Sequence, residues 1–211
     1  MPIPAKICGL TRGEDAEAAL RFGASYLGMI FAGGPRQVTL AQARQVVQAA
    51  AGQVPVFGVF SSQTREEILE IRDVTGLDGA QLHQEPSPAL VEALLAEGVR
   101  VLVVARLSSI EELARLDPLL PLGIPLLVEP KVAGKLGGTG VALSHDLARQ
   151  ARSHLTGHTM FLAGGLTPDS VADAVRAARP DAVDVSSGVE QIPGIKDHDR
   201  LARFLEVLRW L

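Results

Sequence analysis

Short apolar runs alternate with amphipathic stretches along the whole chain. The runs with the length of β-strands cover residues 5–8, 26–31, 56–60, 79–82, 99–105, 125–128, 160–163 and 182–185. Most are continuously apolar and do not alternate apolar with polar positions, which is typical of strands covered on both faces, as in parallel sheets. The stretches between them are long enough for one helix each, so the pattern predicts repeated strand–helix units.

Several of the predicted helices have recognisable first residues. Capping-box patterns begin at Thr11, Thr39, Thr64 and Ser108, and proline follows a capping residue at Ser87 and Thr167. In a capping box, two side chains satisfy backbone N–H groups that lack a partner within the helix. Proline suits the first helical position because its missing N–H is not needed there. Ser144 is expected to cap a helix that reaches residue 155, and the last helix is expected over about residues 197–208.

Eight strands that each precede a helix predict a single (β/α)8 TIM barrel over residues 1–211. A doubly wound open sheet is the alternative. The composition, 47% hydrophobic and 21% charged, supports a sizeable buried core. We find no linker or low-complexity segment that would divide the chain.

Charge and composition exclude several classes of partner. The net charge is −4 and no run of Lys or Arg occurs, so nucleic acid is not expected. The most apolar segment, residues 119–128, contains two prolines and is too short for a membrane span. No signal peptide is recognisable, and Cys8 is the only cysteine, which fits a reducing cytoplasm.

Polar side chains follow several predicted strands. Active sites of TIM barrels form at the carboxyl ends of the strands. The residues expected there are Cys8, Arg36, Gln81, His83, Glu129 and Asp184. We therefore treat these residues as the candidate site.

Cys8 has two interpretations. A buried cysteine often acts as a small apolar residue. A cysteine before a helix start instead has a lowered pKa and serves as a reactive thiolate. Its position alone leaves both open.

Each of the other polar candidates could also have a purely structural role or lie at the surface. Arg36 follows a Gly-Gly-Pro turn and could bind a carboxylate or phosphate in a bidentate manner, or lie solvated at the surface. Glu129 could be a general acid, or pair with Lys131 or Lys135. His83 fits packing or substrate contact. Asp184 is a charge within an apolar strand, which indicates a buried partner or a function.

Glycine clusters follow the last three strands. They are Gly137-Gly138-Thr139-Gly140, Gly164-Gly165 and Ser186-Ser187-Gly188. Backbone N–H groups in such loops bind phosphate, and TIM barrels often use the loops after strands seven and eight. We predict phosphate contacts from Gly138, Gly140, Gly164, Gly165, Ser187 and Gly188, although tight turns alone would also explain the glycines. No metal-ligand motif is present, so we do not expect a metal.

Taken together, these motifs resemble the phosphoribosylanthranilate isomerase family of tryptophan biosynthesis. The matching segments are Lys6-Ile7-Cys8-Gly9-Leu10-Thr11, Gly58-Val59-Phe60, Gln81-Leu82-His83, Lys131 with residues 137–140, Ala163 through Pro168, and residues 184–190 leading to residues 193–197. They extend from one end of the chain to the other in the family's order.

The resemblance implies an Amadori rearrangement of a small phosphorylated substrate, N-(5-phosphoribosyl)anthranilate, to an aminodeoxyribulose 5-phosphate. It implies Cys8 as general base, Glu129 at the general acid position, Arg36 at the anthranilate and Asp184 near the sugar. Gln81 and His83 are expected to contact the substrate, and no cofactor is implied. A homodimer is one arrangement that the apolar end of the last helix would allow.

The chain departs from the family pattern at three places. Glu129 stands where aspartate is usual, Gly34 precedes Pro35-Arg36 in place of serine, and Gln84 replaces a common glycine. Two alternatives therefore stay open. One is another phosphate-binding barrel enzyme, such as the histidine-pathway aminoaldose isomerase or indole-glycerol-phosphate synthase. The other is a non-enzymatic regulatory barrel that binds phosphoribosyl compounds.

Overall fold

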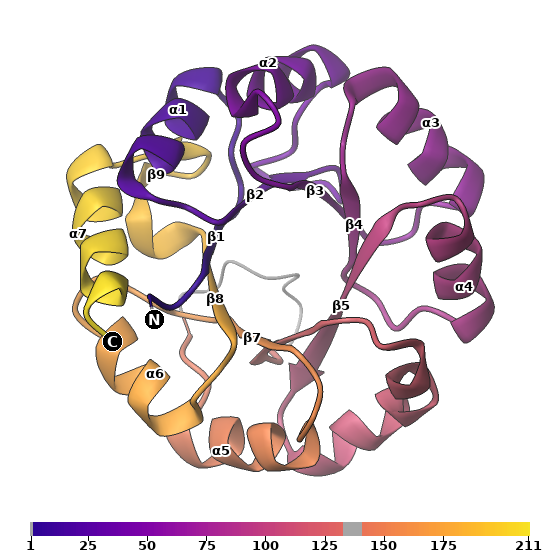
Figure 1. Cartoon of the computed structure of the whole chain (residues 1–211), viewed down its shortest axis with the longest axis vertical. Coiled ribbons are helices and arrows are strands. Elements are labelled where there is room, and N and C mark those ends of the chain that lie inside the picture. The colour runs from indigo at the N-terminus through magenta and orange to yellow at the C-terminus, as the bar shows by residue number, and fades with distance from the viewer. Residues whose placement is uncertain (1, 133–140) are drawn as a thin grey trace.

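Eight parallel strands form a closed barrel. The computed structural model describes residues 2–132 and 141–211. The strands are β1 (Ala5–Ile7), β2 (Tyr26–Ile30), β3 (Val56–Phe60), β4 (Gly79–Leu82), β5 (Arg100–Leu107), β6 (Leu126–Pro130), β7 (Met160–Leu162) and β8 (Ala182–Val185). Each pairs with the next, and β8 pairs with β1, which closes the sheet (Figure 1). The predicted barrel is confirmed, and the open-sheet alternative is wrong because an open sheet would have two edges.

Helices surround the barrel as an outer ring (Figure 1). They are α1 (Gly13–Phe22), α2 (Leu40–Ala50), α3 (Arg65–Thr75), α4 (Pro88–Ala96), the 3-10 helix η1 (Ile110–Leu122), α5 (His145–His154), α6 (Val171–Ala178) and α7 (His198–Arg209). Each follows the strand with which the sequence paired it. The ring covers the outer faces of the strands and explains why the strand segments are continuously apolar.

Four predicted helix starts are confirmed by side-chain hydrogen bonds. Thr39 and Thr64 form complete capping boxes at the starts of α2 and α3. The Ser87 and Ser144 hydroxyls accept hydrogen bonds from backbone N–H groups at the starts of α4 and α5, and Pro88 occupies the first position of α4. These caps rest on local sequence alone, which is why they were predictable.

Three other predicted starts are wrong in detail. The Thr11 hydroxyl donates to the carbonyl oxygen of Gly194 at 2.6 Å and does not cap α1. The Ser108 hydroxyl and backbone N–H instead donate to the Glu112 carboxylate, and the element that follows is a 3-10 helix that contains two prolines. The Thr167 hydroxyl does accept from the Ser170 backbone N–H, but residues 168–170 form a turn and α6 begins only at Val171. At Thr11 and Ser108, another partner takes the capping group.

Aromatic rings help to fill the inside of the barrel. The Tyr26 ring on β2 lies with its centroid 6.2 Å from that of Phe57 on β3 and 5.4 Å from that of Phe161 on β7. Leu102, Val104 and Leu127 complete this cluster with Ala163 just after β7 and Ala182 on β8. Burying each large apolar side chain contributes roughly 1.5–3 kcal/mol. The packed interior holds the strands that carry the site.

The segment between β8 and α7 contains elements that the sequence did not predict. A short 3-10 helix, η2 (Ser187–Val189), leads into the antiparallel hairpin β9 (Glu190–Ile192) and β10 (Ile195–Lys196). This hairpin places Glu190 and Lys196 near the mouth of the barrel.

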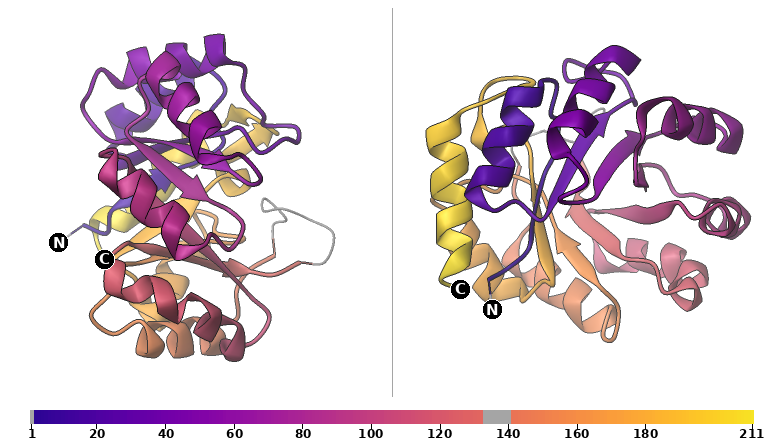
Figure 2. Two further views of the ribbon diagram at one scale, coloured as in Figure 1. Left: turned by 90° about the vertical axis from the view of Figure 1, so that its right-hand side faces the viewer. Right: turned by 45° about the horizontal axis from the view of Figure 1, so that its top comes forward.

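The two ends of the chain lie close together (Figures 1 and 2). The Ile3 amide donates to the Leu208 carbonyl oxygen at 3.2 Å, which joins the first residues to α7. Among residues 2–132 and 141–211, no helix has both the length and the apolar character that a bilayer crossing requires.

Candidate active site

The strands bring the predicted polar residues to one end of the barrel. Cys8 directly follows β1, Gln81 lies on β4 with His83 just beyond it, Glu129 lies on β6 and Asp184 on β8. Cys8, Gln81, His83 and Asp184 are buried, each less than 10% exposed. Because parallel strands all end on the same side, residues that are far apart in sequence form one site.

Lys6 is a site residue that the sequence analysis missed. Its side chain is 0% exposed, and its Nζ donates to Asp184 Oδ1 at 2.7 Å. Lys6 and Asp184 are register partners on β1 and β8. The missed signal was spacing, because residues two apart on a strand share one face and Lys6 precedes Cys8 by two positions. Asp184 thus has the buried partner that its apolar surroundings indicated.

Gly28 on β2 provides room for both Lys6 and Cys8. A Cβ atom at Gly28 would lie 2.8 Å from Lys6 Nζ and 3.0 Å from Cys8 Sγ. The ammonium group and the thiol therefore lie against the same patch of β2 backbone. A larger residue at Gly28 would displace one or both groups.

Burial raises the pKa of the Cys8 thiol. The Lys6 ammonium opposes this shift, and the Asp184 carboxylate adds to it. The predicted lowering by a helix N-terminus is wrong, since α1 begins only at Gly13. Burial also acts to lower the pKa of Lys6, but Asp184 and Cys8 outweigh it, and that pKa is raised.

Glu129 lies between a histidine and an arginine. His83 Nε2 lies 3.2 Å from Glu129 Oε1, and Arg106 Nε lies 3.5 Å from the same oxygen. The predicted alternative, an ion pair with Lys131, is wrong because Lys131 pairs with Glu112. Lys135 lies outside the described residues. The carboxylate of Glu129 therefore lies against His83 and Arg106, and its side chain is 12% exposed.

Several buried polar atoms at this end of the barrel lack a hydrogen bond within the described part of the chain. They are Gln81 Oε1, His83 Nδ1, Glu129 Oε1 and Ser186 Oγ. Glu129 Oε1 is within ion-pair distance of His83, but the two groups are not aligned for a hydrogen bond. Buried polar groups are normally paired, and an unpaired one is costly. Their grouping indicates a site that receives a polar ligand.

Arg36 is held in place by Glu190. Its Nε donates to Glu190 Oε1 at 2.9 Å and its Nη2 donates to Oε2 at 2.7 Å. Lys196 Nζ also donates to Glu190 Oε1, at 2.9 Å. The side chain of Arg36 is 13% exposed, so the alternative of a solvated surface arginine is wrong. Neither Glu190 nor Lys196 is predicted as a site residue from the sequence.

The same three residues perturb one another's pKa values. Burial opposes ionisation of Glu190, but its hydrogen bonds from Arg36 and the charge of Lys196 hold its pKa below the usual value. The hydrogen bond to Glu190 raises the pKa of Arg36. Burial lowers the pKa of Lys196 despite the opposing effect of Glu190. Glu190 is therefore the anion that balances two cations beside the site.

Two of the predicted phosphate-binding glycines also have a packing role. Gly164 has a φ of 94°, and a Cβ there would lie 2.2 Å from Pro130 Cδ. A Cβ at Gly188 would lie 1.8 Å from the Leu166 carbonyl oxygen. The loops after β7 and β8 thus pack against their neighbours with no room for a side chain. Gly165 and Ser187 lie in these same loops, whereas Gly138 and Gly140 lie outside the described residues.

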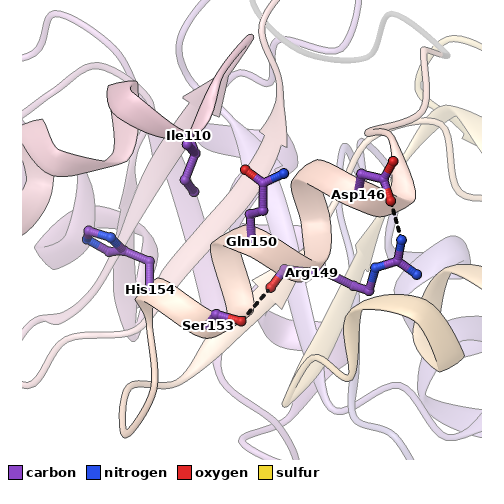
Figure 3. Close-up of a pocket in the computed structure, with 6 residues that line it drawn as sticks. All are labelled: Ile110, Asp146, Arg149, Gln150, Ser153 and His154. Carbon is purple, nitrogen blue, oxygen red and sulfur yellow. Dashed lines mark hydrogen bonds and ion pairs between the residues drawn. The ribbon is translucent and has the colours of Figure 1, made fainter.

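A separate hollow lies on the outer side of the barrel. It is lined by Ile110, Asp146, Arg149, Gln150, Ser153 and His154 (Figure 3). Asp146 pairs with Arg149, and Ser153 Oγ donates to the Arg149 carbonyl oxygen at 3.1 Å (Figure 3). Among the described residues, none of the six that line the hollow has a buried polar atom without a hydrogen bond, in contrast to the residues at the barrel mouth. Within the described residues, no three His, Cys, Asp or Glu side chains form a group that could hold a metal ion.

Comparison with known proteins agrees with this geometry. The family model for N-(5'-phosphoribosyl)anthranilate (PRA) isomerase matches residues 5–207. A relative of that name from Magnetococcus marinus is 40% identical over 210 residues, which cover 99% of this chain and 96% of the relative.

Two solved structures are similar over almost their whole length. A structure described as monomers of a dimeric phosphoribosylanthranilate isomerase from Thermotoga maritima has a TM-score of 0.82 and 31% identity, covering 99% of this chain and 100% of that one. A phosphoribosylanthranilate isomerase in complex with reduced 1-(o-carboxyphenylamino)-1-deoxyribulose 5-phosphate has a TM-score of 0.85 and 30% identity, with the same coverage. The chain therefore belongs to the N-(5'-phosphoribosyl)anthranilate isomerase family and is an isomerase of tryptophan biosynthesis.

Proposed function

We propose that this chain converts N-(5'-phosphoribosyl)anthranilate to 1-(2-carboxyphenylamino)-1-deoxyribulose 5-phosphate with Cys8 as general base and Glu129 as general acid. The observation that carries the proposal is the group of unpaired buried polar atoms around Gln81, His83 and Glu129, at the same end of the barrel as Cys8. A similar solved enzyme holds a reduced form of this product.

The reaction needs one proton donor and one proton acceptor. The donor protonates the furanose ring oxygen, so the ring opens to an iminium ion. The cationic nitrogen acidifies the proton on the neighbouring C2, and a base removes that proton to give an enolamine. The enolamine then tautomerises to the ketone. Each proton transfer requires a side chain within hydrogen-bonding reach of the substrate.

Glu129 is suited to the donor role by its position on β6. It is nearly buried, and its Oε1 has no aligned hydrogen-bond donor in the described residues. His83 and Arg106 limit where its carboxyl group can move. A positioned carboxyl group that faces the ligand can deliver a proton without a large rearrangement.

Cys8 is suited to the acceptor role by its place beside Lys6 and Asp184. The thiolate is the reactive form of cysteine. Because burial raises the pKa of Cys8, the thiol predominates near neutral pH in the free enzyme. The thiolate, which is the form that can accept a proton, is therefore a minor species, and its fraction depends on the charges around the sulfur.

The remaining candidates would orient the substrate. Arg36, fixed by Glu190, offers its guanidinium group to the anthranilate carboxylate. Gln81 and His83 supply unpaired polar atoms, and Asp184 would contact the substrate near the sugar and amine, as the family resemblance implies. The loops that contain Gly164, Gly165, Ser187 and Gly188, with Gly138 and Gly140, would bind the 5-phosphate through backbone N–H groups. Binding energy from the phosphate then helps to align the reacting carbons.

Two further points belong to the proposal. Trp210, 84% exposed at the end of α7, supports a homodimer in which it is covered by a second copy. The single cysteine, kept as a free thiol, supports a cytoplasmic enzyme. Sedimentation of the purified protein tests the dimer.

The activity is tested with freshly generated phosphoribosylanthranilate. We expect the purified protein to consume it without added metal or cofactor, seen as loss of the substrate's fluorescence. Binding of a phosphorylated substrate analogue without any turnover would contradict the proposal and favour a regulatory barrel.

A further inference from the structure

Three buried ionisable groups meet inside the barrel beside β2. Lys6 is 0% exposed, Cys8 is 5% exposed and Asp184 is 9% exposed. The proposed acid–base chemistry uses Cys8 and places Asp184 near the substrate, but it gives no task to Lys6. A buried lysine is rare unless it is paired, and a charge held there at a cost usually serves a purpose.

The backbone fixes Lys6 next to Cys8. Both side chains point to the same face of the chain because they are two positions apart at the end of β1. Lys6 Nζ and Cys8 Sγ both lie within about 3 Å of the point where a Gly28 Cβ would be. The ammonium group is therefore beside the sulfur, and its other contact is the Asp184 carboxylate at 2.7 Å.

The sulfur needs such a cation to become a thiolate. A buried anion is unfavourable unless a positive charge or hydrogen-bond donor stabilises it. The charged groups that face Cys8 are Lys6 on β1, Asp184 on β8, Lys196 on β10 and Arg36 after β2. Arg36 and Lys196 both donate to Glu190, which offsets their charge. Of these charged groups, Lys6 has the largest effect on the pKa of the Cys8 thiol, and its positive charge acts to lower that pKa.

We propose that Lys6 is a positioning residue that stabilises the thiolate of Cys8, and that Asp184 limits this effect by sharing the same ammonium group. The proposal rests on the proposed function, because the thiolate matters to catalysis only if Cys8 is the base. Substrate groups that draw Asp184 away from Lys6 would leave the ammonium free to stabilise the thiolate.

Because Cys8 is the single cysteine, the ionisation of its thiol can be measured directly in the free enzyme. Thiolate absorbance near 240 nm is followed during a pH titration, and the curve of Cys8→Ser is subtracted so that only Cys8 contributes. We expect Lys6→Met to raise the titration midpoint and Asp184→Asn to lower it. For each unit that the midpoint rises, the thiolate fraction near neutral pH falls about tenfold.

A double variant covers the case in which Lys6→Met fails to fold because Asp184 is left buried without a partner. Lys6→Met/Asp184→Asn removes both charges, and we expect a midpoint above that of the wild type. Lys196→Met is the matched control. It removes another buried lysine, whose charge lowers the pKa of the Cys8 thiol less than that of Lys6 does. Its midpoint is expected to rise less than that of the double variant.

Two results would overturn the proposal. One is a wild-type midpoint in folded Lys6→Met or in the double variant. The other is a raised midpoint in Asp184→Asn, since the loss of a neighbouring anion must favour the thiolate. The titration uses no substrate, so it stays decisive even if Cys8→Ser is fully active. That activity result would contradict the role of Cys8 as base and leave the electrostatic pairing intact.

Discussion

Arg106 and Glu129 are register partners on the adjacent strands β5 and β6, with Arg106 Nε 3.5 Å from Glu129 Oε1. His83 approaches the same oxygen to 3.2 Å from the end of β4. Three neighbouring strands thus define the place of one carboxyl group.

Changing Glu129 tests its role as proton donor. We expect Glu129→Gln to lower kcat by about 10²–10⁴-fold, because an amide is not a general acid at neutral pH. Glu129→Asp keeps the acid but shortens the side chain, so an intermediate kcat is expected. Steady-state kinetics measure both, with circular dichroism as the check on folding. A fully active Glu129→Gln enzyme would move the acid to another group.

Removing Arg106 tests whether the position of Glu129 matters. Arg106→Met is expected to reduce kcat by about tenfold or more, since misplacing a catalytic group by about 1 Å can cost roughly 10²-fold. The matched control is Arg100→Met, which removes an exposed arginine from the beginning of the same strand. If both variants show the same small change in kcat, Arg106 has no part in placing the carboxyl group.

The fold was predictable because its signals are local. Continuous apolar strands and the caps at Thr39, Thr64, Ser87 and Ser144 depend on neighbouring residues. For the site, the sequence predicted individual residues but not which of them pair with each other. Lys6 meets a partner 178 positions away, and Arg36 meets Glu190 across 154 positions. Such pairs follow from barrel closure and from the β9–β10 hairpin, neither of which has a signature at the residues concerned.

The direction of the pKa shift at Cys8 could not be predicted from the local sequence either. Its position before a helix predicted a lowered value, but the residues between Cys8 and Gly13 separate the thiol from the start of α1. Burial then has the largest effect on the thiol, and it acts in the opposite direction. Burial depends on the closed barrel and was not available from the local sequence.

Gly188 tests the packing of the phosphate loops. In Gly188→Ala, the new methyl group would lie 1.8 Å from the Leu166 carbonyl oxygen, so the loops must move apart. We expect a loss of about 1–3 kcal/mol in the free energy of unfolding and a raised KM. Gly13→Ala is the control, because its Cβ would have no contact closer than 3.4 Å. Wild-type stability and KM in Gly188→Ala would show that the loops adapt without cost.

Asp15 predicts how stability depends on acid. This fully buried carboxylate on α1 accepts from Arg12, from the Lys196 backbone N–H at 3.2 Å and from His198 at 2.9 Å. Burial opposes its ionisation, but the hydrogen bonds from Arg12 and His198 outweigh it and lower its pKa below 3.8. The carboxylate therefore stabilises the fold fully above that pH and loses this contribution as the pH falls through the lowered pKa.

The comparison of Asp15→Asn with the wild type measures this contribution. Urea unfolding from pH 7 to pH 3 should show a difference of about 2 kcal/mol near neutral pH that shrinks below pH ~4. Asp173→Asn, which alters an exposed pair with Arg176, should change stability by less than about 1 kcal/mol. A difference that stays constant down to pH 3 would show that the Asp15 charge is not what stabilises the fold.

The most direct test of the acid–base assignment is the turnover of Cys8→Ser with freshly generated phosphoribosylanthranilate. The serine hydroxyl is close in size to the thiol but far less readily ionised, so the fold should persist while proton abstraction fails. We predict a fall in kcat of about 10²–10⁴-fold with an unchanged circular dichroism spectrum. Turnover near that of the wild type would contradict the assignment of Cys8 as the base.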